Sequence, residues 1–78
     1  MTEQFTKLLA EEILSIYKEK YVLPNQSLNA WDILESTNVD KESLLCGMDW
    51  LIENGLIRKD ENLKGNFILN ASGYVKTL

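Results

Sequence analysis

Residues 44–57 read LLCGMDWLIENGLI, and this stretch decides the fold. Its large apolar residues first recur every three or four positions, which is the period of one face of a helix. These residues are Leu44, Leu45, Met48, Leu51 and Ile52. Asn54-Gly55 then closes the helix, because glycine readily takes the left-handed conformation with which helices commonly end. Leu56-Ile57 follows as extended chain, so the stretch predicts a helix that runs through a glycine into a strand.

The start of this helix also has a clear signal. Asp40 is placed to cap the free amides of the first turn, and Val39 and Leu44 are placed to pack together as a hydrophobic staple. The predicted helix covers residues 40–54. Gly47 inside it costs about 1 kcal/mol relative to alanine, and the interpretation we favour is a close approach by another helix.

The period changes from helical to extended beyond Gly55. Residues 56–59 and 66–70 are predicted as two short strands, and the polar stretch between them makes them a hairpin. Residues 71–78 are expected to form a short helical turn that begins with Ser72 as its cap. The residues of this turn expected to pack inward are Tyr74, Val75 and Leu78.

Two further helices are predicted before residue 40. Pro24 separates a first helix over residues 2–20 from a second over residues 27–36. Ser27 is expected to cap the second helix, and Trp31 is expected to lie in the core.

The first helix carries two apolar stripes, turned from each other by roughly a third of a circle. The first stripe is Phe5, Leu8, Leu9, Ile13 and Ile16, and the second is Ala10, Leu14, Tyr17 and Tyr21. A helix covered from two sides within one chain explains both stripes. A dimer contact through Leu14, Tyr17 and Tyr21 is the alternative.

This order of elements resembles the winged helix-turn-helix superfamily. The residues that carry the resemblance are 44–57, together with Asn66 to Tyr74, which resemble the second wing strand leading into a closing helix. The resemblance implies one α+β domain over residues 1–78, with three helices, a two-stranded β-hairpin wing and a short C-terminal helical turn. Such domains often place the third helix in the major groove of DNA, whereas others use the fold for protein contacts.

Composition argues against catalysis. The chain has no histidine, and Cys46 is its single cysteine. The commonest general base, the usual metal ligand and an internal disulfide are therefore missing from the sequence. We expect no enzymatic activity, no cofactor, no metal and no small-molecule substrate. Cys46 is expected to be inert, because neighbouring acids raise rather than lower the pKa of a thiol.

The N-terminus and the apolar runs bear on localisation. Residues 1–5 lack the basic start and apolar stretch of a signal peptide. Apolar runs stay far below the roughly 20 residues that span a bilayer. We therefore expect a cytoplasmic protein that makes no membrane contact.

Charge separates the two uses of the winged helix. The net charge is −4, and residues 21–54 hold one lysine against six acids, which gives −5. Residues 55–78 hold four bases against two acids, which gives +2. Because phosphate contacts supply most non-specific DNA affinity, a DNA-reading helix should be basic. The acidic third helix disfavours nucleic acid as a partner.

Trp50 has two interpretations. Either its ring folds back over the edge of the core, or it stands out beside Cys46 and Glu53 as an interface anchor. The function we expect is a non-catalytic binding module with a protein partner or a homodimer. The interface candidates are Trp50, Cys46, Glu53, Leu14, Tyr17 and Tyr21.

The alternative function is a dimeric DNA-binding transcriptional regulator. Its third helix and wing would supply the contacts to DNA. The candidate residues for these contacts are Lys41, Ser43, Arg58, Lys59 and Lys64.

Overall fold

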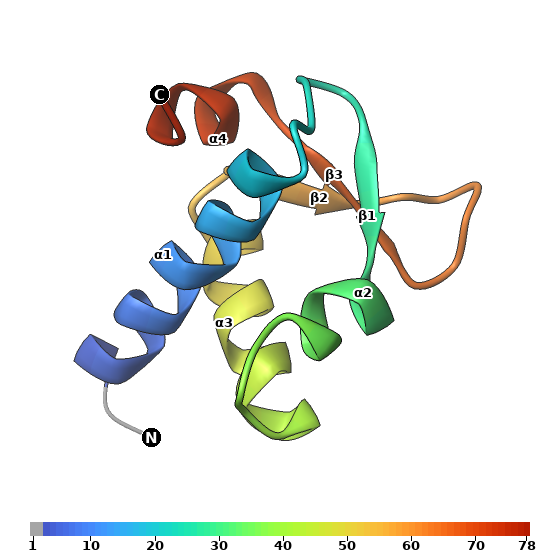
Figure 1. Cartoon of the computed structure of the whole chain (residues 1–78). Helices are drawn as coiled ribbons and strands as arrows, with labels where there is room; N and C mark the ends of the chain where they lie inside the picture. The colour runs from blue at the N-terminus through green and yellow to red at the C-terminus, as the bar shows by residue number, and fades with distance from the viewer. Residues whose placement is uncertain (1–2) are drawn as a thin grey trace.

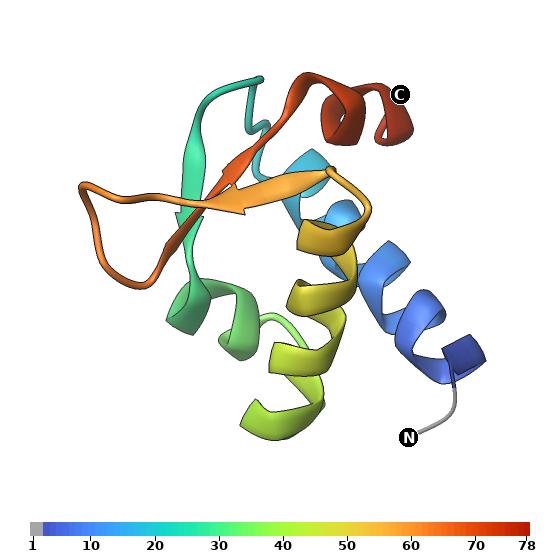
Figure 2. The same cartoon turned by 180° about the vertical axis from the view of Figure 1, so that it is seen from behind.

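A three-stranded antiparallel sheet and four helices make up residues 3–78, the part of the chain that the computed structural model describes (Figures 1 and 2). The α+β class predicted from the sequence is confirmed. The elements in chain order are α1 (Glu3–Glu19), β1 (Ser27–Asn29), α2 (Ala30–Glu35), α3 (Lys41–Glu53), β2 (Ile57–Lys59), β3 (Asn66–Leu69) and α4 (Ala71–Lys76). Thr2, where the first helix was predicted to begin, lies outside the described residues.

α1 packs closely against α3 at Gly47. A Cβ atom on Gly47 would lie 2.9 Å from Cδ1 of Ile13 and 3.1 Å from Cγ of Leu9. Both distances are shorter than ordinary van der Waals contact, so α1 can cross α3 this closely only because residue 47 has no side chain (Figure 1). The expectation that Gly47 serves a close helix approach is confirmed.

The end of α3 follows the sequence signal. Gly55 has a φ of 72°, and its amide and that of Leu56 donate to the carbonyl oxygens of Ile52 and Leu51. This pair of hydrogen bonds is the Schellman arrangement of a helix end. At the other end, Asp40 occupies the cap position with extended backbone, but its carboxylate accepts from the Ser43 hydroxyl instead of from a backbone amide.

The helix predicted over residues 27–36 needs correction, because its first three residues form strand β1. β1 pairs with β3, which lies between β1 and β2 in the sheet. The helix begins at Ala30, and its cap is Asn29, whose side-chain oxygen accepts from the amide of Trp31 at 2.9 Å. The Asn29 side chain also donates to that of Asn66 on β3, so pairing with a distant strand sets the start of α2.

The C-terminal segment forms a helix, α4, in which Asn70 rather than Ser72 occupies the N-cap position. The Ser72 hydroxyl donates to the Gly55 carbonyl oxygen at 2.8 Å. Gly73 lies against the chain between α3 and β2, and a Cβ on it would be 2.1 Å from the Leu56 carbonyl oxygen. Tyr74 packs against the core, as expected. The inward packing predicted for Val75 and Leu78 was wrong, since both are exposed.

The core lies between α1, α3 and the inner face of the sheet. Its fully buried large side chains are Tyr17, Ile13, Ile33, Leu44, Met48, Leu51, Ile57 and Leu69. Three residues assigned to core stripes, Phe5, Leu8 and Leu45, are exposed instead. The apolar faces predicted for α1 and α3 are therefore wider than the faces that the core covers.

The second stripe of α1 is covered largely within the chain. Ala10, Leu14 and Tyr17 are buried, whereas Tyr21 is exposed. The alternative of a dimer contact through Leu14 and Tyr17 is not supported, because their side chains already pack in the core of one copy. In residues 3–78, helices long and apolar enough to cross a membrane are absent.

Candidate functional site

The outer ridge of α3 is acidic. Glu42, Cys46, Asp49 and Glu53 follow one another at spacings of four, three and four residues, which places them on one line along a helix. All four side chains are exposed. The ridge therefore presents three carboxylates and one thiol to solvent.

Lys41 and Ser43, the two DNA candidates on α3, make contacts within the chain. The Lys41 ammonium lies over the ring of Trp31, 5.8 Å from its centroid, which is within cation–π range. The Ser43 hydroxyl donates to the Asp40 carboxylate. This hydrogen bond is the main reason why the pKa of Asp40 lies below its usual range.

The three DNA candidates on the hairpin are Arg58, Lys59 and Lys64. Arg58 donates to the side-chain oxygens of Asn70 and Asn25, and so joins β2 to the start of α4 and to the turn after α1. Lys59 and Lys64 are exposed at the end of β2 and in the loop of the hairpin. All three hairpin candidates are thus exposed, and Arg58 is the one whose hydrogen bonds hold its side chain against the protein.

Trp50 folds back over the edge of the core. Its ring is half-buried and packs against the core cluster. It lines an open hollow of about 520 Å³ together with Glu3, Gln4, Lys7 and Lys76. The hollow beside the ring holds Lys7 and Lys76 as well as Glu3, and the role of Trp50 as an interface anchor stays a prediction.

Trp31 is the tryptophan that faces solvent. Its side chain is 62% exposed, and the prediction that it lies in the core was wrong. Successive helical residues turn by about 100°, so Trp31 points away from Ile33, the buried residue of α2. The spacing of two residues between Trp31 and Ile33 is the signal that could have revealed this, because helical residues two apart face nearly opposite sides.

A small apolar hollow lies beside Trp31, between α2 and the first turns of α3. Its volume is about 80 Å³. It is lined by Ala30, Trp31, Leu34, Lys41, Leu44 and Leu45. We call this surface the Trp31 notch. The aliphatic lining and the exposed ring make it suited to an apolar side chain rather than to a polar ligand.

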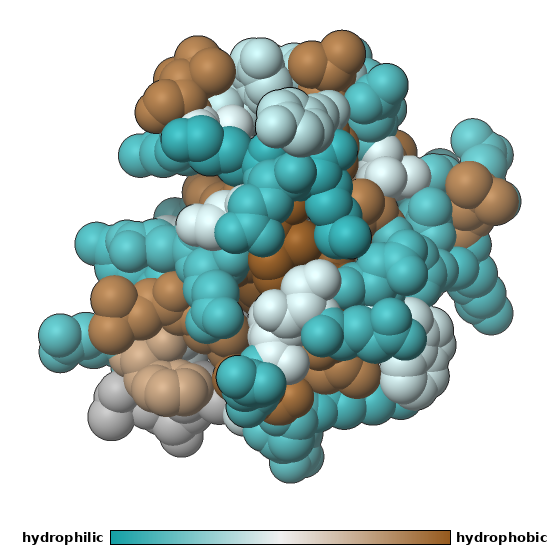
Figure 3. Space-filling view, in the orientation of Figure 1, coloured by the Kyte–Doolittle hydropathy of each residue, from teal (hydrophilic) through white to brown (hydrophobic). Residues whose placement is uncertain are grey.

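A second apolar region lies at the opposite end of the molecule. Exposed apolar residues gather around α4 and the turn after α1, where brown atoms mark the top of the surface in Figure 3. They are Tyr21, Leu23, Val75 and Leu78. Two hollows open between α1 and α4 in this region.

Residues 3–78 contain neither a cluster of three potential metal-ligating His, Cys, Asp or Glu side chains nor a buried side-chain nitrogen or oxygen without a hydrogen-bond partner. Comparisons of the chain with family models, curated proteins and solved structures gave no match. Surface chemistry must therefore carry the functional argument.

Proposed function

We propose that this chain is a small winged-helix domain that binds another protein through the Trp31 notch. The winged-helix assignment is supported by the succession of α1, α2 and α3, then Gly55, then the β2–β3 hairpin. β1 adds a third strand beside the hairpin, between the first and second helices. Since this fold serves both DNA and protein partners, the choice between them rests on the exposed surface.

The observation that carries the proposal is the exposure of Trp31. A tryptophan that leaves 62% of its surface in water contributes little to its own core. Tryptophan is enriched among the few residues that supply most of the affinity of protein interfaces. An apolar side chain of a partner that entered the notch would remove water from the indole and from the neighbouring leucines.

The charge near the notch indicates which charged residues a partner should carry around its apolar anchor. Residues 21–54 have a net charge of −5, and the acidic ridge of α3 lies on the same helix as Leu45 and Lys41. Complementary charge speeds association and disfavours wrong partners. The expected partner is a protein with an apolar anchor surrounded by lysine and arginine.

The notch is tested by comparing two alanine variants of exposed apolar residues. The immobilised wild-type protein, Trp31→Ala and Leu63→Ala are each used to capture proteins from an extract of the cells that make this chain. Leu63 is 57% exposed in the hairpin loop and serves as the matched control. We expect a partner that wild type and Leu63→Ala retain and that Trp31→Ala loses. Equal capture by all three proteins would exclude the notch as the binding surface.

DNA binding remains the second candidate, because Lys59 and Lys64 are exposed on the hairpin. The acidic ridge of α3 argues against it, since carboxylates repel phosphates. The test is titration of a labelled mixed-sequence duplex at low salt, where electrostatic affinity is largest. We expect no binding. Salt-dependent binding that the double variant Lys59→Glu/Lys64→Glu abolishes would favour the DNA function and contradict the protein proposal.

A further inference from the structure

α1 and α3 end in the same way, with one difference in sequence. In α1, the amides of Tyr21 and Val22 donate to the carbonyl oxygens of Lys18 and Tyr17. This is the Schellman pair of hydrogen bonds that Gly55 and Leu56 make at the end of α3. The left-handed position is glycine in α3, at a φ of 72°, but tyrosine in α1, at a φ of 55°.

Tyrosine at this position is unfavourable for the isolated fold. A residue with a Cβ in the left-handed conformation costs roughly 1–2 kcal/mol, a cost that glycine avoids. The side chain returns little to the core, because 87% of it is exposed. Backbone strain of this kind is typical of functional positions. The Tyr21 ring is therefore best explained by a contact outside the chain.

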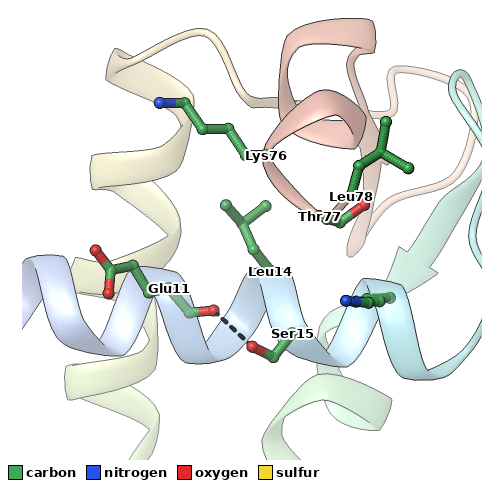
Figure 4. A pocket seen from close by; sticks show the side chains of 7 residues that line it. Glu11, Leu14, Ser15, Lys76, Thr77 and Leu78 are labelled. Atoms are coloured by element: carbon green, nitrogen blue, oxygen red, sulfur yellow. Dashed lines mark hydrogen bonds between the residues drawn. The ribbon is translucent and has the colours of Figure 1, made fainter.

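A groove lies beside this ring, along the seam between α1 and α4. It consists of two adjoining hollows of about 370 and 420 Å³ that share Lys18, Thr77 and Leu78 as lining residues. In Figure 4, Leu14 points from α1 toward α4 at the floor of the first hollow. Val22 and Tyr74 line the second hollow beside Tyr21.

The charges of the groove differ from those of the molecule as a whole. Within residues 3–78, the charged residues that line its two hollows are Glu11, Lys18 and Lys76. The side chains that line the groove therefore sum to +1, whereas those of the chain sum to −4. Lys18 lies where the two hollows meet, so an occupant of either hollow comes close to its ammonium group.

We propose that the groove between α1 and α4 binds an amphipathic helix of a partner protein, with carboxylates flanking the apolar stripe of that helix. A groove between two helices accepts a third helix through apolar anchors spaced three and four residues apart. Tyr21 and Leu78 contact these anchors, and Lys18 and Lys76 pair with the flanking carboxylates.

Charge also argues against a second copy of this chain in the groove. A symmetric dimer brings the same patch of each copy together. Two copies of a patch in which lysines outnumber acids would then be brought together, which is unfavourable. The groove and the Trp31 notch are separate surfaces, since α4 and α2 lie at opposite corners of the molecule in both views (Figures 1 and 2).

The test uses two labelled 18-residue helical peptides that share one leucine stripe. One carries glutamates beside the stripe and the other carries lysines at the same positions. Fluorescence anisotropy gives the affinity of each peptide for the wild-type protein, Tyr21→Gly, Lys18→Glu, Leu63→Ala and Trp31→Ala. Tyr21→Gly removes the ring and relieves the left-handed strain, so its unfolding midpoint should equal or exceed that of wild type. A loss of binding in this variant is then not a loss of folding.

We expect the glutamate peptide to bind wild type, Leu63→Ala and Trp31→Ala alike. Its affinity for Tyr21→Gly should be at least about tenfold weaker, the loss typical of an interface anchor. Lys18→Glu should reverse the preference between the peptides. Equal affinity of both peptides for wild type, or full binding by Tyr21→Gly, would overturn the proposal. So would a dimer in sedimentation equilibrium that Tyr21→Gly dissociates, since a second copy would then occupy the groove.

Discussion

The hydroxyl of Tyr17 donates a hydrogen bond of 2.8 Å to the carbonyl oxygen of Phe67, fifty positions further along the chain. Tyr17 is fully buried in α1, and Phe67 lies in β3, the central strand of the sheet. The bond thus ties the first helix to the strand that both other strands pair with. Burial also raises the pKa of Tyr17 well above its ordinary value, because the ionised form would lose its hydration.

Replacing Tyr17 by phenylalanine should destabilise the fold while keeping its shape. The change removes the donor and leaves the Phe67 carbonyl buried with one partner fewer, which costs about 1–3 kcal/mol. Urea unfolding followed by circular dichroism measures the loss. Tyr21→Phe is the matched control, because the exposed Tyr21 hydroxyl should not affect stability. An unchanged midpoint for Tyr17→Phe would contradict the importance of this bond.

The same tyrosine should make stability fall at alkaline pH. Its pKa is raised in the folded state, so its contribution is fully present below the unfolded pKa of about 10 and is lost as the pH rises above that value. The measurement is the free energy of unfolding of wild type and Tyr17→Phe between about pH 8.5 and 11.5. All other ionisable groups are the same in both proteins, so the difference between the curves isolates Tyr17. We expect that difference to shrink as pH rises, whereas parallel curves would contradict the prediction.

Gly73→Ala should destabilise the fold by disturbing the packing of α4 against the chain between α3 and β2. The new Cβ would lie 2.1 Å from the Leu56 carbonyl oxygen, a backbone atom that cannot turn aside. Overpacking of this kind typically costs about 1–3 kcal/mol. Gly47→Ala is an informative comparison, because its nearest obstacle is the mobile Cδ1 of Ile13 and alanine gains about 1 kcal/mol in helix propensity. Thermal unfolding should show Gly73→Ala to be less stable than Gly47→Ala. The reverse order would mean that the contact at Gly73 is not the tighter of the two.

The parts of the fold that local signals specify could be predicted from the sequence. α3 ends at Gly55 as expected, because the helix period and its glycine stop lie within a few residues of each other. β1 was missed because its three residues become a strand only by pairing with residues 66–68 of β3. Nothing in the local sequence of residues 27–29 distinguishes such a strand from the first turn of a helix.

The candidate site was predicted less well than the fold, and for the same reason. Trp31 was predicted to lie in the core, and Trp50 was the tryptophan considered as an interface anchor, whereas the structure exposes Trp31 and half-buries Trp50. The acidic character of α3 was predicted, because it follows from the charge count of the sequence alone. The groove beside Tyr21 depends on how α4 lies against α1, which is a long-range contact that no local pattern carries.

Asn29 should link stability to the shape of the Trp31 notch. Its side-chain oxygen accepts from the amide of Trp31, and its side-chain nitrogen donates to Asn66 at 3.0 Å. Asn29→Ala removes both bonds, and loss of a helix cap alone typically costs about 0.5–2 kcal/mol. Asn29→Asp keeps an acceptor for the cap but has no donor for Asn66, so its free energy of unfolding should lie between those of wild type and Asn29→Ala.

Because α2 is only six residues long, loss of its cap should also make the Trp31 indole more mobile, and Trp31 fluorescence can report this change in a Trp50→Phe background. Equal stability of the two Asn29 variants would mean that the bond to Asn66, rather than the cap, fixes the start of α2.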